Sequence, residues 1–187
     1  MNFLLTKLSL GDRGTQAARK LRVTILYECM DTGKQAKRFT DQLADELADV
    51  EATNRAFDLN LWSFGVLGMR QIRNDSVGMA TDADLVILSM SGKNPLPAQV
   101  EEWIEMWTWL IDGHKPAVVA LFAAPDTKAG RIRAYLRRAA VSKGLRFFPH
   151  TISAVDDTNR EENLSVRGAA EVEAADVARH QFSRMVQ

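Results

Sequence analysis

The chain has 187 residues, of which 46% are hydrophobic and 26% are charged, a balance typical of a globular protein with an apolar core. Its 24 basic and 24 acidic residues give a formal net charge of zero, which excludes a general electrostatic attraction to nucleic acid or to an anionic membrane. The only cysteine, Cys29, excludes an internal disulfide, and no apolar run approaches the roughly 18 residues that cross a membrane, so a cytoplasmic protein is expected.

The first strand and the first helix are predicted from residues 21–50. The run LRVTILY (21–27) is aliphatic, β-branched and of strand length. Thr32, with Gln35 three residues later, predicts a capping box that opens a helix. Apolar residues then recur at spacings of three and four and predict one buried stripe, which consists of Ala36, Phe39, Leu43, Leu47 and Val50.

The next segments predict a half-exposed strand, an uneven helix and a buried strand. Residues 56–62, AFDLNLW, alternate apolar and polar side chains, which is typical of a strand with one exposed side. Residues 63–82 carry apolar side chains at helical spacing, but glycines interrupt them. Residues 83–90, ADLVILSM, form a continuous apolar run, which favours the centre of a parallel sheet. The segment SGKNPLP is therefore expected to leave the carboxyl end of a central strand.

Residues 97–112 predict an amphipathic helix, with Pro97 in its first turn and Gly113 after its end. One arc is apolar and comprises Val100, Trp103, Ile104, Trp107, Leu110 and Ile111, and the other is acidic and comprises Glu101, Glu102, Glu105 and Asp112. Trp109 falls in the middle of the acidic arc. Because aromatic residues are enriched at protein interfaces, we expect Trp109 to contact a protein partner, a second copy in a homodimer, or the C-terminal segment.

The remaining segments predict a second buried strand (116–123), a basic helix (127–144), a fifth strand (145–152) and a last helix (about 169–185). Positive charge is concentrated around the basic helix at Arg131, Arg133, Arg137, Arg138, Lys143 and Arg146. They favour a solvated helix face over a nucleic-acid contact, because Tyr135 is the only aromatic residue of the helix and no nucleic-acid-binding module is present.

Strand and helix alternate five times without an internal repeat, which predicts one α/β domain over residues 1–187. A polar N-terminal segment (1–20) and a C-terminal helix (about 169–185) would flank its sheet. We expect a three-layer sandwich around a five-stranded parallel sheet of flavodoxin-like order 2-1-3-4-5, while the pattern alone leaves a Rossmann order open.

Sheets of this kind bind ligands outside the carboxyl ends of the strands where the strand order reverses, here between strands 1 and 3. The loops at that point are ECMDTGK (28–34) and SMSGKNPLP (89–97). Their hydroxyls, backbone N–H groups and cations suit a phosphate, and the candidate binding residues are Thr32, Gly33, Lys34, Ser89, Ser91, Gly92, Lys93 and Asn94. The alternative interpretation is that Thr32 only caps the helix, Gly33 is a flexible link and Lys34 is a solvated charge.

The segment ILYECMDTGKQAKRF, together with the loop after the third strand, resembles the flavodoxin family. Flavodoxins hold the flavin phosphate in a turn of Thr-Gly-Asn-Thr type, so the resemblance implies an FMN phosphate at Thr32 and Gly33. Lys34 and Gln35 stand where that turn has Asn and Thr, and Asp31 adds a negative charge. The loop after the third strand has no aromatic side chain to cover the flavin ring, and Trp62 is a poorly placed substitute.

The same topology resembles the receiver domains of response regulators. Glu28 and Asp31 imitate the acids that such domains carry after their first strand. Ser89 and Met90 occupy the region of the phosphoacceptor aspartate, and no lysine follows the fifth strand, so phosphotransfer is not expected. The resemblance therefore implies a degenerate receiver that is used for contacts.

No catalytic or metal-binding residues are predicted. The sequence SGK lacks the P-loop frame, and the three histidines are far apart with no metal-ligand spacing. Cys29 is interpreted as a small buried residue rather than a nucleophile. Three functions stay open, and we rank the first highest: a non-catalytic signalling or interaction module, an FMN-binding redox protein, or an enzyme acting on a phosphorylated small molecule.

Overall fold

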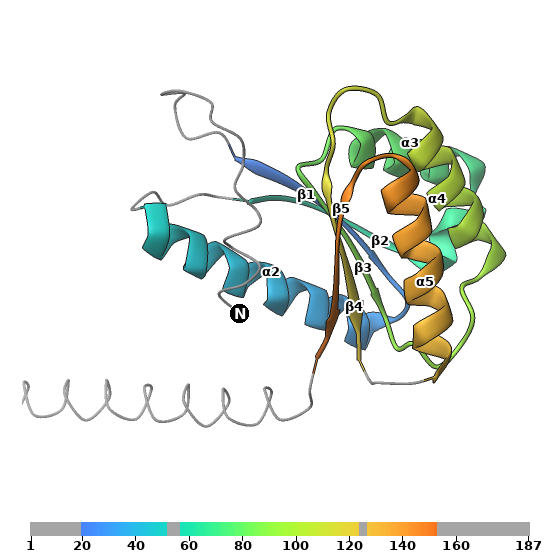
Figure 1. Ribbon diagram of the computed structural model, residues 1–187, viewed down its shortest axis with the longest axis horizontal. Coiled ribbons are helices and arrows are strands. Elements are labelled where there is room, and N and C mark those ends of the chain that lie inside the picture. The colour runs from blue at the N-terminus through green and yellow to red at the C-terminus, as the bar shows by residue number, and fades with distance from the viewer. Residues whose placement is uncertain (1–19, 52–56, 124–126, 153–187) are drawn as a thin grey trace, which may run out of the picture. The chain divides into compact units, whose positions relative to one another are not determined.

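The structure is a computed structural model that describes residues 20–51, 57–123 and 127–152 (Figure 1). Five parallel strands form one sheet in the order β2-β1-β3-β4-β5. This result confirms the α/β class and the flavodoxin-like order, and it excludes the Rossmann order. The predicted N-terminal segment, apart from Lys20, and the predicted C-terminal helix lie outside the described residues.

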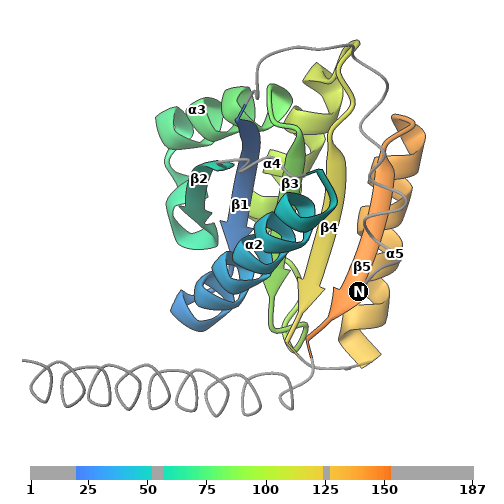
Figure 2. The same ribbon diagram turned by 90° about the vertical axis from the view of Figure 1, so that its left-hand side faces the viewer.

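The strands are β1 (Leu21–Tyr27), β2 (Phe57–Ser63), β3 (Leu85–Met90), β4 (Ala117–Phe122) and β5 (Arg146–Thr151). The helices are α2 (Met30–Glu51), α3 (Arg70–Thr81), α4 (Ala98–Leu110) and α5 (Thr127–Ser142), and a short 3₁₀ helix, η1 (Phe64–Gly68), precedes α3. Figures 1 and 2 show α2 on one face of the sheet and α3, α4 and α5 on the other. The sheet is therefore the middle of three layers.

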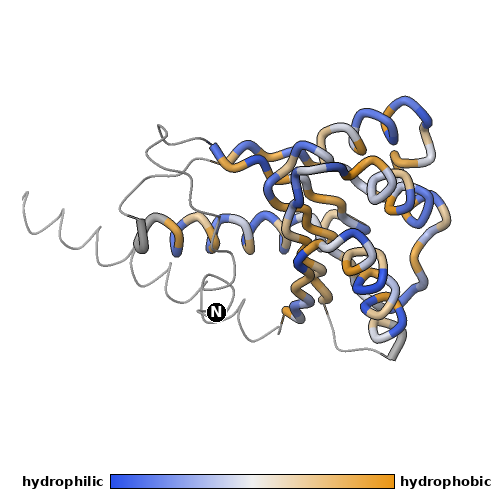
Figure 3. Tube along the Cα trace, turned by 45° about the horizontal axis from the view of Figure 1, so that its top comes forward, coloured by the Kyte–Doolittle hydropathy of each residue, from blue (hydrophilic) through white to orange (hydrophobic). Residues whose placement is uncertain are grey.

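The central strands β3 and β4 are buried at every residue. They pair in parallel with Val86 opposite Val118 and Leu88 opposite Ala120. Their continuous apolar sequence follows from this position, because helices cover both of their faces. Figure 3 shows the apolar residues gathered along the sheet, while the helices carry polar bands on their outer sides.

The larger core lies between the sheet and the helices α3, α4 and α5. Trp103 of α4 is its largest fully buried side chain. The indole N–H of Trp103 donates a hydrogen bond to Ser76 Oγ of α3 at 2.8 Å, and the Trp103 ring stacks on Trp107 with 5.4 Å between the ring centroids. Through these contacts Trp103 fixes α4 against α3 as well as against the sheet.

The other face of the sheet packs against α2, which contacts β1 and β3. The predicted apolar stripe of α2 is confirmed at Ala36, Phe39, Leu43 and Leu47, all of which are buried. The side chain of Val50 lies outside the described residues. The helix thus rests on the strands whose carboxyl ends carry the two candidate loops.

The single uneven helix expected over residues 63–82 is two helices. The 3₁₀ helix η1 ends at Gly68, and Met69 adopts an extended conformation with φ −81° and ψ 116° before α3 begins at Arg70. This break leaves Met69 62% exposed. The glycine-interrupted pattern reflects a change of helix rather than one irregular helix.

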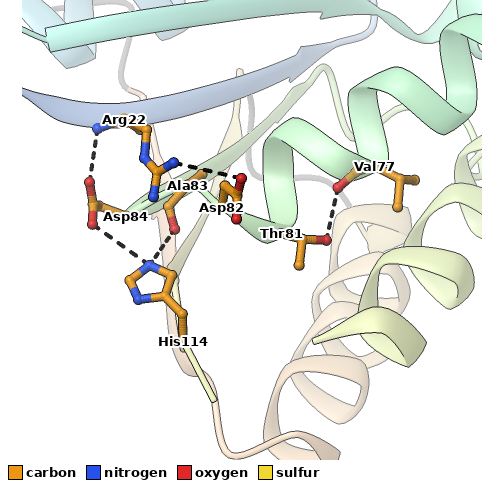
Figure 4. A network of polar contacts seen from close by, with 7 residues as sticks. All are labelled: Arg22, Val77, Thr81, Asp82, Ala83, Asp84 and His114. Atoms are coloured by element: carbon orange, nitrogen blue, oxygen red, sulfur yellow. Dashed lines mark hydrogen bonds and ion pairs between the residues drawn. The ribbon is translucent and has the colours of Figure 1, made fainter. Parts of the chain in front are cut away.

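A polar network ties together the amino ends of three strands (Figure 4). The Asp84 carboxylate accepts a hydrogen bond from the Arg22 N–H at 2.9 Å, and the Ala117 N–H donates to the Asp84 carbonyl at 3.0 Å. His114 Nε2 lies 2.8 Å from the Ala83 carbonyl oxygen and 3.7 Å from Asp84 Oδ1. This network lies at the edge of the sheet opposite to the candidate loops.

Candidate functional site

The candidate loops meet at the carboxyl ends of β1 and β3. Only Glu28 and Cys29 separate β1 from α2. The Glu28 N–H donates to the Ser89 carbonyl at 3.0 Å, which continues the pairing of the two strands by one residue. The two loops are therefore held together by main-chain hydrogen bonding from their first residue.

The structure brings some of the predicted site residues together. Ser89 Oγ donates to the Thr32 carbonyl at 2.8 Å, and the Lys93 N–H donates to Ser91 Oγ at 3.3 Å. Thr32, Gly33, Ser89 and Gly92 are buried, whereas Lys34, Lys93 and Asn94 are exposed. The buried members of the set hold the loops in place, and the two lysines extend outward from different loops.

The predicted capping box at Thr32 is wrong. The helix α2 begins at Met30, and the Gly33 N–H donates to the Cys29 carbonyl at 2.9 Å, so Cys29 occupies the cap position. Thr32 lies in the first turn, where its Oγ1 accepts from the Cys29 N–H at 3.0 Å and is 2.9 Å from the Cys29 carbonyl, to which it donates. Thr32 thus fills the position from which a capping-box side chain reaches back to the cap residue.

Glu28 is the residue that sequence reasoning missed at this site. Its carboxylate accepts a hydrogen bond from the Ser91 N–H at 2.5 Å and so bridges the two loops. The sequence offers no signal for this contact, because the partners are 63 residues apart. The Glu28 carboxylate is therefore hydrogen-bonded to a backbone N–H at the point where the strand order reverses.

Three of the donors expected for a flavin phosphate are bonded within the protein. The hydroxyl protons of Thr32 and Ser89 go to main-chain carbonyls, and each hydroxyl has only one proton to donate. The Ser91 N–H is bonded to the Glu28 carboxylate, whose negative charge also opposes a bound anion. The assignment of the eight loop residues as a ligand site stays a prediction.

The two loop glycines have packing reasons of their own. A Cβ atom on Gly33 would lie 3.1 Å from Cδ2 of the Tyr27 ring. Gly92 has φ +77°, and a Cβ atom there would lie 2.9 Å from the Cβ atom of Ala129 in α5. Gly92 is therefore required by its backbone conformation and by the packing of α5, and Gly33 allows the close approach of the Tyr27 ring.

Cys29 and Trp62 differ in their surroundings from what the sequence suggests. Cys29 is an exposed free thiol and not the buried apolar residue expected, because it caps the amino end of α2 instead of lying in the sheet. Trp62, half-buried at the end of β2, packs against the core between the sheet and α3–α5. It is therefore not a cover for the β1 and β3 loops.

A second candidate site lies on the outward surface of α4. Glu105, Met106, Trp109 and Leu110 line a shallow, apolar hollow of about 480 Å³, and we call these four residues the α4 patch. Trp109 is 77% exposed, which confirms that it lies off the buried arc of the helix. Leu110 was expected on that arc but is 45% exposed, because α4 ends at this residue.

The exposed surface of α5 is basic. Arg131, Arg137 and Arg138 are exposed, as expected for a solvated face. Arg133 does not belong to that face: its guanidinium lies 5.2 Å from the centroid of the Phe122 ring, and it donates to Thr151 Oγ1 at 3.4 Å. The exposed charge of α5 is thus confined to the side that faces away from the sheet.

Tyr135 lies on α5, the helix that carries these arginines. Its side chain is half-buried and packs against the core. Burial first, and then the carboxylates of Glu105 and Glu101, raise the pKa of the Tyr135 phenol above its usual value of 10.0. Both acids belong to α4, which is in contact with α5.

Within the described part of the chain, no group of three or more His, Cys, Asp or Glu residues is arranged to hold a metal ion. None of the described helices has a stretch both long and apolar enough to cross a membrane. No protein-family model matches the sequence, and no curated protein matches it.

Proposed function

We propose that this chain is a non-catalytic protein-interaction domain that binds its partner through the α4 patch. Trp109 is the observation that carries the proposal. It is 77% exposed on an otherwise well-packed helix, next to the half-exposed Leu110 and an apolar hollow. An indole exposed to this degree leaves a large apolar surface in water, and tryptophan is the residue type most enriched among the dominant contacts of interfaces.

The carboxyl edge of the sheet supports the same proposal. The Thr32 and Ser89 hydroxyls and the Ser91 N–H are bonded within the protein, and the Glu28 carboxylate lies where an anionic ligand would need donors. A protein that bound a phosphate there would have to break these hydrogen bonds first. The α4 surface needs no such rearrangement, because its apolar groups already face the solvent.

The experiment is a comparison of three baits in cell extract: the wild-type chain, Trp109→Glu and Met69→Glu. Met69 is 62% exposed on the segment between η1 and α3, so its substitution is a control for the loss of an exposed apolar side chain. Captured proteins are identified by mass spectrometry and then tested as purified partners by calorimetry.

We expect Trp109→Glu to lose the partner and Met69→Glu to keep it. Equal capture by all three baits, with a second copy of the chain counted among the captured proteins, would contradict the proposal. A titration with FMN, followed by flavin fluorescence, tests the redox alternative on the same samples. Saturable FMN binding at micromolar concentration would replace the interaction function with the flavin-binding one.

A further inference from the structure

We infer that the partner of the α4 patch is a second copy of this chain, in a two-fold symmetric dimer in which α4 of each protomer packs on α5 of the other. This inference rests on the proposed function, because it names the occupant of the α4 patch. Three properties of the described surface support it: unpaired opposite charges, the same spacing of charged and apolar groups on both helices, and the parallel course of the two helices.

The opposite charges lie on neighbouring helices without pairing. Glu101 and Glu105 of α4 are exposed, as are Arg131, Arg137 and Arg138 of α5. None of these five side chains forms an ion pair or a hydrogen bond with another residue of the described segments. The two helices that carry these charges are in contact with each other. The acidic and basic surfaces are therefore both available to a partner.

Both surfaces also carry exposed apolar groups. Trp109 lies one turn beyond Glu105 on α4, and Val141 lies one turn beyond Arg137 on α5, where it is 63% exposed. An interface built from these residues would have tryptophan and valine at its centre and charges beside them. Apolar burial would supply the affinity, and the charges would fix the orientation.

The spacing of these residues is the same on the two helices. Each helix follows a strand of the same parallel sheet and returns along it, so α4 and α5 run in the same direction, and they are in contact. Trp109 follows Glu105 by one turn and Val141 follows Arg137 by one turn, so a charged and an apolar group come in the same order on both helices. A register that brings Glu105 to Arg137 therefore also brings Trp109 to Val141.

Consider a two-fold axis that runs between the two helices, parallel to them and in the plane of the interface. It exchanges α4 with α5 and leaves every residue at the same position along the helix axis. It places α4 of one protomer on α5 of the other, so that each Glu105 meets Arg137 and Arg138 of its partner and each Trp109 meets Val141. The same contact forms twice. An axis perpendicular to the helices would instead place α4 on α4 and bring like charges together.

The experiment is sedimentation velocity on the full chain at concentrations from about 1 to about 200 µM, a range that spans weak and moderate dimers. The variants are Trp109→Glu, Glu105→Arg, the double variant Arg137→Glu with Arg138→Glu, and the triple variant that combines all three charge reversals. Asp75→Arg and Arg70→Glu on α3 are the matched controls, because both residues are exposed outside the proposed interface. Circular dichroism verifies that each variant is folded.

We expect the wild type and both controls to dimerise. Trp109→Glu and the separate charge reversals should weaken the dimer at least about tenfold, and the combined reversal should restore it. A change in folding would not explain why the combined reversal restores a dimer that each separate reversal weakens. A triple variant as weak as the separate reversals would overturn the pairing of α4 with α5.

Two further outcomes separate the dimer from the proposed function. A wild type that stays monomeric over the whole range would overturn the dimer, while a different protein captured through Trp109 would still support the interaction function. A dimer that Trp109→Glu leaves intact would overturn the α4–α5 dimer. The absence of any capture difference between the baits, together with a wild type that stays monomeric, would contradict the interaction function itself.

Discussion

The carboxylate of Glu28 accepts a hydrogen bond at 2.5 Å from the backbone N–H of Ser91, and this bond joins the loop after β1 to the loop after β3. Hydrogen bonds to an ionised acceptor are shorter and stronger than neutral ones. The bond lies where the strand order reverses, which is the usual ligand position of such sheets. In this protein, the hydrogen bond between Glu28 and Ser91 lies at that position.

Replacing Glu28 with alanine should lower the free energy of unfolding by about 1.5–3 kcal/mol, because it removes a charged acceptor and leaves the Ser91 N–H without its partner. Urea denaturation measures the effect. Glu28→Gln keeps an acceptor oxygen and should lower the free energy of unfolding by less. Equal losses for alanine and glutamine would contradict the role of Glu28 as the hydrogen-bond acceptor of the Ser91 N–H.

The variant Gly92→Ala should destabilise the protein more than Gly113→Ala. Both glycines have positive φ, +77° and +75°, so an alanine costs about 1–2 kcal/mol at either position. At Gly92 the new Cβ atom would also lie 2.9 Å from Ala129 Cβ, whereas nothing lies within 4 Å at Gly113. Overpacking should add about 1–3 kcal/mol at Gly92. Equal unfolding free energies for the two variants would contradict the packing role of Gly92.

Ser76→Ala should lower the free energy of unfolding by about 1–3 kcal/mol, because the buried indole N–H of Trp103 would lose its acceptor. Thermal or urea unfolding is the measurement. Ser142→Ala is the control: its hydroxyl is exposed and donates to the Ala139 carbonyl at 2.9 Å within its own helix. We expect that control to stay within about 0.5 kcal/mol of the wild type.

Stability should fall as the pH rises above 10.0, the usual pKa of a tyrosine. The folded state raises the pKa of Tyr135, so the unfolded state loses the phenolic proton first, and its ionisation then favours unfolding. The contribution is fully present below that pH and is lost as the pH rises through the folded pKa. Tyr135→Phe should show a shallower alkaline loss, and Glu105→Gln an intermediate one, in unfolding measured as a function of pH.

The buried parts of the fold are the parts that the sequence predicts well. The strands β3 and β4 are read as central from their continuous apolar runs, and both are buried at every residue. The stripe of α2 and the arc of α4 are predicted for the same reason, because burial leaves a periodic signal in the residue types. Leu110 departs from its arc because the helix ends there.

The carboxyl edge is predicted less well, because polar residues take part in alternative contacts of similar chemistry. Thr32 has the residue type of a helix cap, but it lies inside the first turn of α2 and accepts a hydrogen bond from Cys29, which is the cap residue. The bond between Glu28 and Ser91 depends on two loops that only the folded sheet brings together. Residue types indicated a polar edge, but the pairing of its donors and acceptors is a property of the tertiary structure.

The stacking of Trp103 on Trp107 makes the core of this protein spectroscopically distinct from its surface. Two indoles with centroids 5.4 Å apart couple their electronic transitions, and both are buried, whereas Trp109 is 77% exposed. Coupled transitions of the buried pair would report on core packing in circular dichroism, while a collisional quencher would reach Trp109 first. One protein sample could therefore report loss of the core and occlusion of the α4 patch as separate optical events.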